Sequence, residues 1–239
     1  MGATMQMWSP QHIAALALGA AVTVLLIWVA RRHGDACLQV TGRGLALIIL
    51  ATYACEHAVY AVRGVWTAQV NLPLHLTDAV TLISIAALWR PDIALLVEVL
   101  YFWALAASLQ AVLTPDLGYA FPDPLFFTYF VTHAGAVAAA CMLVFGARRT
   151  PRAGAVLRVY AATLGFAALA GIGTVLTGGN YMYLRRKPSS ASLLDVMGPW
   201  PAYILAAAAL ALLLFTALAL AARVMPARPR PTAGRPGAT

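Results

Sequence analysis

Charged residues are scarce in this sequence: of its 239 residues only 10% are Asp, Glu, Lys or Arg, whereas 62% are hydrophobic. Soluble domains carry roughly 25% charged residues, so the composition excludes a soluble globular domain. The mean hydropathy is +0.80, and hydrophobic runs of about 20 residues recur along the whole chain, which indicates an integral membrane protein. These runs are rich in Ala and Leu and do not alternate with polar residues, so we predict an all-α fold rather than a barrel.

Cysteine is also rare. The three cysteines, Cys37, Cys55 and Cys141, are too few and too scattered for a disulfide framework or a zinc cluster, and we expect no metal and no cofactor. No basic stretch precedes the first apolar run and no small-residue cleavage pattern follows it, so we expect a retained helix rather than a signal peptide. The last apolar run contains no lysine, which excludes a Schiff-base photoreceptor.

The formal net charge is +8, but we do not interpret it as a sign of nucleic-acid binding. The basic residues lie in short connections and in the C-terminal segment, as the positive-inside rule would place them. If the N-terminus is outside, only four of the sixteen basic residues fall on the outer side: Arg63, Arg185, Arg186 and Lys187. The remaining basic residues are then cytoplasmic, which predicts an outer N-terminus, a cytoplasmic C-terminus and an odd number of spans.

We predict a polytopic membrane domain over residues 1–224, with an ordered outer loop at 178–200. The Pro- and Arg-rich segment 225–239 is predicted to be a disordered cytoplasmic tail. Each of the apolar runs is about 17–21 residues long, enough for a hydrocarbon core of about 30 Å. The seven predicted transmembrane helices are Ile13–Val29, Leu45–Val62, Leu72–Leu88, Ile93–Leu113, Leu125–Phe145, Val156–Leu176 and Ala202–Ala222.

Several polar side chains fall at similar depth within these runs. In so apolar a setting each one needs a partner or a function. At about 1.5 Å per residue, Thr77 lies about 7–8 Å below the outer end of its helix and His133 about 12 Å below. Asn180, in the outer loop, would lie just above them. One slab in the outer half of the membrane therefore holds Glu56, His57, His75, Thr77, Asp78 and His133.

Thr77, Thr81 and Ser84 share one helix face, with i, i+4, i+7 spacing. Thr81 and Ser84 either line the site or bond back to their own main chain, as hydroxyls in membrane helices often do. Glu98, nearer the inner side, is interpreted as a partner for an arginine such as Arg90.

Thr77 and His133 form the predicted nucleophile and base, because a hydroxyl nucleophile needs a base within hydrogen-bond reach. His75 or Asp78 would orient the base or hold a water. Asn180 would orient groups or stabilise an oxyanion, and Glu56 and His57 are further supporting residues.

Three stretches carry a family resemblance: LPLHLTDAVTL from Leu72, LYFWALAASLQAVLTPDL from Leu100, and GGNYMYLRRKPSSASLLDVMGPWPAYI from Gly178. They resemble the YwaF-type family of bacterial intramembrane proteins, which implies a location in the bacterial inner membrane. Its animal relative is similar to an ether-phospholipid acyltransferase with a cysteine nucleophile and a histidine. More distant androgen-induced and ADTRP-like relatives are threonine hydrolases of lipid esters. The resemblance implies that Thr77 is the nucleophile, where many bacterial members have cysteine, and that His133 is its partner.

Two functions remain open at this point. The first is an intramembrane lipid acyltransferase or lipid-ester hydrolase, with membrane lipids as substrates. The second is a transporter or small-molecule-binding protein with a polar cavity in the outer half of the bilayer, in which Glu56, His57 and Glu98 would titrate. The absence of an inverted repeat disfavours the second. The oligomeric state is not indicated by the sequence.

Overall fold

The computed structural model describes residues 4–188 and 192–224, and all regular structure in these residues is helical. The predicted tail 225–239 lies outside the described residues. Two of the long rods are composite, because α4 continues through η1 into α5 and α6 continues into η2. The elements are α1 Pro10–Arg32, α2 Asp35–Val62, α3 Leu76–Trp89, α4 Ala94–Trp103, η1 Ala104–Ser108, α5 Leu109–Leu113, α6 Pro124–Cys141, η2 Met142–Gly146, α7 Ala155–Thr177, η3 Tyr181–Tyr183, η4 Leu193–Met197 and α8 Ala202–Arg223.

The starts of α1 and α6 are encoded locally. Ser9 caps α1 by accepting a hydrogen bond from the N–H of His12 at 3.3 Å, and Asp123 caps α6 by accepting one from the N–H of Leu125 at 2.8 Å. Each cap is followed by a proline in the first turn, where the missing N–H costs nothing because it would have no intrahelical partner.

Six helical rods among the described residues are long and apolar enough to cross a membrane. The third predicted span, Leu72–Leu88, is the exception: α3 begins only at Leu76 and has 14 residues, or about 21 Å. Pro73 disfavours helical geometry at Leu72, and residues 72–75 form turns, with the N–H of Leu74 bonded to the carbonyl of Leu72 at 2.7 Å. The prediction of seven full-length transmembrane helices is therefore not confirmed, and the structure supports six.

α3 nevertheless lies at the centre of the bundle, packed against α2, α4 and α6. Its Val80 and Ala87 are fully buried in the same apolar core as Ile49 of α2 and Leu100 of α4. Small residues allow the neighbouring helices to approach closely. A Cβ atom on Gly146 would lie 2.6 Å from the Cβ of Ala30, so the packing of η2 against α1 requires glycine there.

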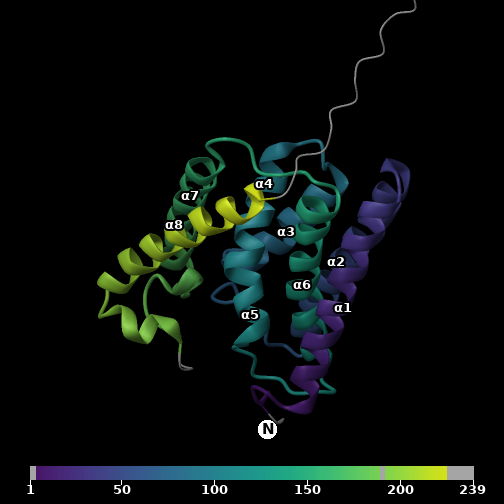
Figure 1. Cartoon of the computed structure of the whole chain (residues 1–239). Helices are drawn as coiled ribbons and strands as arrows, with labels where there is room; N and C mark the ends of the chain where they lie inside the picture. Colours follow the sequence, from purple (N-terminus) through teal and green to yellow (C-terminus); the bar gives the residue numbers. More distant parts are fainter. Residues whose placement is uncertain (1–3, 189–191, 225–239) are drawn as a thin grey trace, which may run out of the picture.

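The helices form two flanks with a central pair between them (Figure 1). α1, α2 and α6 lie on one flank, α7 and α8 pack against each other on the other, and α3 and α4 lie between them. α1 starts and α8 ends at opposite ends of the bundle. We call these the N-terminal end, with connections 63–75, 114–123 and 178–201, and the arginine-rich end, with connections 33–34, 90–93 and 147–154. Which end is cytoplasmic stays a prediction.

Candidate functional site

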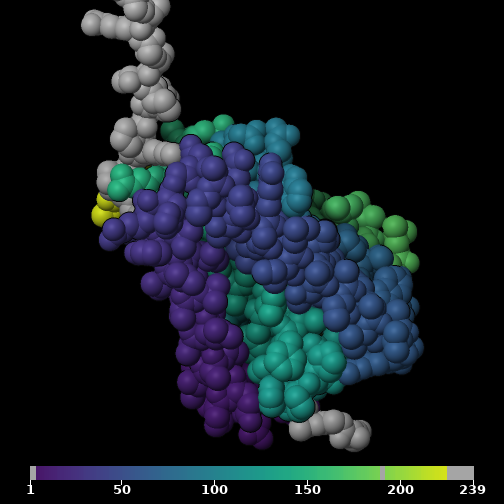
Figure 2. All heavy atoms as spheres, turned by 90° about the vertical axis from the view of Figure 1, so that its right-hand side faces the viewer, coloured from purple at the N-terminus to yellow at the C-terminus, as the bar shows by residue number. Residues whose placement is uncertain are grey.

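The predicted site residues come from elements that meet near the N-terminal end. α2, α3 and α6 pack against one another in all three pairwise combinations. Figure 2 shows that α6, in teal, reaches the surface between α1 and α2 on one face of the molecule. These elements carry Glu56 and His57 on α2, His75 at the N-cap of α3, Thr77 and Asp78 in its first turn, and His133 on α6, while Asn180 lies in the 178–201 connection.

His133 is held in one orientation by its own helix. Its ring stacks on that of Tyr129 with centroids 4.2 Å apart, and its Nδ1 lies 2.8 Å from the main-chain carbonyl oxygen of Tyr129. Because a carbonyl oxygen only accepts, Nδ1 carries the proton. Nε2 is then the basic nitrogen, and it has no hydrogen-bond partner among the described residues.

The hydroxyl stripe on α3 divides into two kinds of residue. Thr81 and Ser84 are buried and donate to main-chain carbonyls one turn back, Thr81 to Thr77 at 3.0 Å and Ser84 to Thr81 at 2.7 Å. The alternative that these two hydroxyls serve their own helix is therefore confirmed. Thr77 is half-buried, and its hydroxyl has no partner in the part of the chain that the structure describes.

Glu56 and Asp78 bring two carboxylates from different helices within electrostatic range of each other. Tyr53 and Tyr60 of α2 interact electrostatically with both. Neither carboxylate has a cationic partner among the described residues; both residues are half-buried, and Asp78 accepts a hydrogen bond from the main-chain N–H of His75. Acid groups left in this state are unusual in an apolar bundle and are typical of a functional site.

The acid pair is connected to the predicted base. Glu56 interacts electrostatically with Tyr129, whose ring and carbonyl hold His133. Tyr129 is anchored in turn by its hydroxyl, which donates to the carbonyl of Ala111 at 2.8 Å. Glu56 therefore interacts both with Asp78 of α3 and with Tyr129, the residue that holds His133.

Two of the predicted supporting residues, His57 and Asn180, form hydrogen bonds with groups other than the predicted catalytic pair. His57 accepts a hydrogen bond at Nδ1 from the indole N–H of Trp66 at 3.1 Å. Asn180 donates to the carbonyl of Arg186 at 2.8 Å and accepts from the N–H groups of Arg185 and Arg186 at 3.0 and 3.1 Å. These contacts organise the segments that carry the two residues, and none of them involves Thr77 or His133.

The N-terminal end is closed over His75 by Tyr181 and Tyr183, whose ring centroids lie 5.0 and 6.1 Å from that of the histidine. Tyr181 is fully buried; its hydroxyl donates to the carbonyl of Ala68 at 2.6 Å and accepts from the N–H of Leu72 at 3.1 Å. This single side chain ties the 178–201 connection to the segment that enters α3.

Tyr183 is bound to a third connection. Its hydroxyl donates to a carboxylate oxygen of Asp116 at 3.3 Å. Burial, together with the nearby Asp116, raises the pKa of Tyr183 to about 12, so the hydroxyl stays protonated and keeps its role as a donor.

Sequence reasoning missed Tyr53 and Tyr60. The signal was available in TYACEHAVY, where Tyr53, Glu56 and Tyr60 follow i, i+3, i+7 and therefore share one face of α2. Among residues 4–188 and 192–224, no group of three or more His, Cys, Asp or Glu is placed to hold a metal ion.

At the other end, the prediction that Glu98 pairs with an arginine is confirmed, but Arg90, the example given, is not that partner. Glu98 is fully buried and binds Arg152 and Arg158, with closest nitrogen–oxygen distances of 2.8 and 3.0 Å. Arg90 pairs instead with its neighbour Asp92 at 2.9 Å. The correct partners could not be identified from local sequence patterns, because they are more than fifty residues from Glu98.

A family model, that of the TMEM164 family, matches residues 7–219. The chain belongs to the TMEM164 family. Membership of this membrane-protein family, together with the six apolar rods, identifies a multi-pass membrane protein. The match supports the membrane assignment of the sequence but not the narrower YwaF-type name or the relatives attached to it. No curated protein and no solved structure matches the chain.

Proposed function

We propose that this TMEM164-family protein is an intramembrane lipid acyltransferase or lipid-ester hydrolase, with Thr77 as nucleophile and His133 as general base. The observation that carries the proposal is the state of His133: Nδ1 is committed to the carbonyl of Tyr129, which leaves Nε2 as the basic nitrogen, and its helix α6 packs against α3. A neutral imidazole with a fixed tautomer is suited to accept a hydroxyl proton.

In the proposed reaction, Nε2 of His133 takes the proton of the Thr77 hydroxyl as Oγ1 attacks the ester carbonyl of a lipid. The tetrahedral intermediate collapses when His133 returns that proton to the leaving alcohol, which leaves the acyl group on Thr77. A second alcohol completes acyl transfer, or water completes hydrolysis, by the same proton path in reverse.

The position of Thr77 favours this chemistry. It lies in the first turn of α3, whose leading N–H groups have no acceptor within the helix, and the N-cap residue His75 makes no side-chain capping bond. These N–H groups, which include that of Thr77 itself, would stabilise the oxyanion. The negative charges of Glu56 and Asp78 would favour the imidazolium form that His133 adopts during the reaction.

Glu98, one of the groups that a proton-coupled transporter would use, is held by five hydrogen bonds from Arg152 and Arg158. Because this carboxylate is committed to a fixed network, we favour the acyl-chemistry proposal over the transporter.

The proposal is tested with the purified full-length protein in nanodiscs, by measuring acyl release or transfer from phospholipids. Thr77→Ala should reduce turnover to background, and His133→Ala should reduce it by about 10²- to 10⁴-fold. Thr81→Ala, one turn along the same face, and His57→Ala are the matched controls and should retain turnover. Wild-type turnover in both Thr77→Ala and His133→Ala would refute the proposal, and loss in His133→Ala alone would refute the covalent step.

A further inference from the structure

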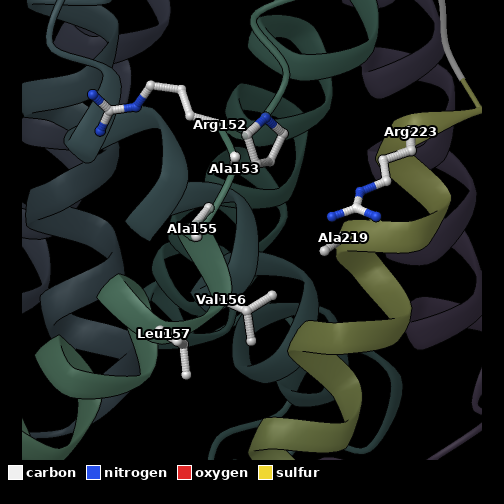
Figure 3. Close-up of a pocket in the computed structure, with 9 residues that line it drawn as sticks. Arg152, Ala153, Ala155, Val156, Leu157, Ala219 and Arg223 are labelled. Carbon is white, nitrogen blue, oxygen red and sulfur yellow. The ribbon is translucent and has the colours of Figure 1, made fainter.

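A cavity of about 460 Å³ lies at the arginine-rich end, between the start of α7 and the end of α8. Its walls differ in chemistry. Arg223 and the main chain around Gly154 are polar, whereas Val156, Leu157 and Ala219 are apolar. Figure 3 shows the Arg223 guanidinium extending from α8 toward the segment that leads into α7, while the Arg152 side chain extends away from Arg223.

Arg223 has no hydrogen-bond or ion-pair partner among the described residues. Arg152, which lines the opposite wall, forms an ion pair with Glu98, and Glu98 also binds Arg158. The Arg152 side chain extends away from Arg223 and is paired with Glu98, so Arg223 is the charged group that remains available to a ligand in the cavity. None of the residues that line the cavity is acidic.

The wall opposite Arg223 offers main-chain donors as well. Gly154 adopts a left-handed conformation with φ of +74°, which turns the chain into α7. The N–H of Ala155 is used by the carbonyl of Arg152 at 3.0 Å, but the next N–H groups of the helix have no intrahelical acceptor. α7 also has no acidic residue in its first turn and no side-chain cap.

We propose that this cavity binds the phosphate group of an anionic phospholipid headgroup. Arg223 would bind the phosphate oxygens, and the apolar surface of Val156, Leu157 and Ala219 would contact the glycerol and the first carbons of the acyl chains. The apolar wall favours a lipid over free phosphate. The lack of a free carboxylate at the cavity favours an anionic headgroup over a zwitterionic one, whose cation would have no partner. The site lies at the opposite end of the bundle from Thr77 and does not depend on the proposed function.

The test uses the purified full-length protein in detergent, with lipid binding measured by native mass spectrometry and by the shift in thermal stability. Phosphatidylglycerol, phosphatidylcholine and inorganic phosphate are compared. We expect phosphatidylglycerol to bind and stabilise, and the other two to do neither. Arg223→Gln should weaken phosphatidylglycerol binding by about 10-fold, since charge-assisted hydrogen bonds are lost. Ala219→Phe, which fills the cavity from the same helix, should abolish binding.

Arg32→Gln is the matched control, because Arg32 is also an exposed arginine in the last turn of a helix; it should bind as the wild type does. Wild-type affinity in both Arg223→Gln and Ala219→Phe would overturn the site. Equal stabilisation by inorganic phosphate would overturn the lipid assignment, and equal binding of phosphatidylcholine would overturn the anionic one. If Arg223→Gln does not fold, Ala219→Phe decides the outcome.

Discussion

The two ends of the molecule differ in whether the acidic side chains within the helix bundle have a cationic partner. At the arginine-rich end, Glu98 receives hydrogen bonds from both Arg152 and Arg158, so its charge is compensated. At the N-terminal end, Glu56 and Asp78 interact electrostatically with each other, and neither is paired with a cation within the described part of the chain. A compensated acid stabilises a fold, whereas an uncompensated pair destabilises it unless the charges serve a ligand or a reaction. The difference supports our proposal that the reaction takes place at the N-terminal end.

Removal of Glu98 should produce the largest loss of stability. Glu98→Ala leaves two arginines without their shared partner, and we expect a loss of about 3 kcal/mol, at the lower end for a buried pair because the arginines can turn toward water. Thermal unfolding in detergent measures the effect. Asp92→Ala, which removes an exposed acid–arginine pair at the same end, should change little. A similar loss of stability in both variants would show that the buried Glu98 contributes no more to stability than the exposed Asp92 does.

Tyr181→Phe should have the next largest effect. It removes the hydroxyl that bonds to Ala68 and Leu72, and leaving these main-chain groups unpaired should cost about 1–2 kcal/mol. Hydrogen exchange should increase in residues 66–75 before the rest of the protein unfolds. Tyr160→Phe, whose hydroxyl makes no hydrogen bond in the described part of the chain, serves as the control. Unchanged exchange in Tyr181→Phe would contradict the clamping role.

Glu56→Gln should leave stability within about 1 kcal/mol of the wild type or raise it slightly, because it removes a charge that faces another acid. Glu98→Gln in the same experiment should lower the unfolding temperature clearly. The comparison between the two ends fails if Glu56→Gln is as destabilising as Glu98→Gln.

The smallest effect is expected at the surface pair of Arg63 and Asp123, 2.9 Å apart. Partial burial tends to raise the pKa of Asp123, but hydrogen bonds from Arg63 and from the N–H of Leu125 outweigh it and hold the pKa below its ordinary value. A depressed pKa stabilises the fold above the unfolded-state pKa of about 3.9, and this contribution is lost as the pH falls through the lower folded value.

Unfolding temperatures measured between about pH 6 and about pH 3 should therefore fall less steeply for Asp123→Asn than for the wild type. Identical slopes would show that this pair does not contribute to the acid sensitivity of the protein.

Local patterns predicted much of the fold. Apolar runs located six of the long rods, because a spanning helix must satisfy its own backbone and expose apolar side chains. α3 was mispredicted because Leu72 and Leu74 continue the apolar pattern, whereas residues 72–75 form turns ahead of the helix. Hydropathy counts side chains and does not register the turns of the main chain.

The candidate site was predicted from depth together with the family resemblance. Helical rise placed Glu56, Asp78 and His133 in one slab; in the structure Glu56 interacts with Asp78 and with Tyr129, which holds His133. Depth does not specify rotation about a helix axis, so it also placed Asn180 and His57 among the supporting residues, although both are occupied by local hydrogen bonds. The roles of Thr77 and His133 in catalysis stay predictions.

Sequence alone determined that this chain is an all-helical membrane protein, that its basic residues concentrate toward one side and that its polar groups are grouped by depth, because each of these follows from composition or from helical rise. Tertiary structure decided which acid is neutralised, which nitrogen of His133 is basic and which arginine is left free beside a cavity. These depend on contacts between helices far apart in the chain, and no local pattern specifies them.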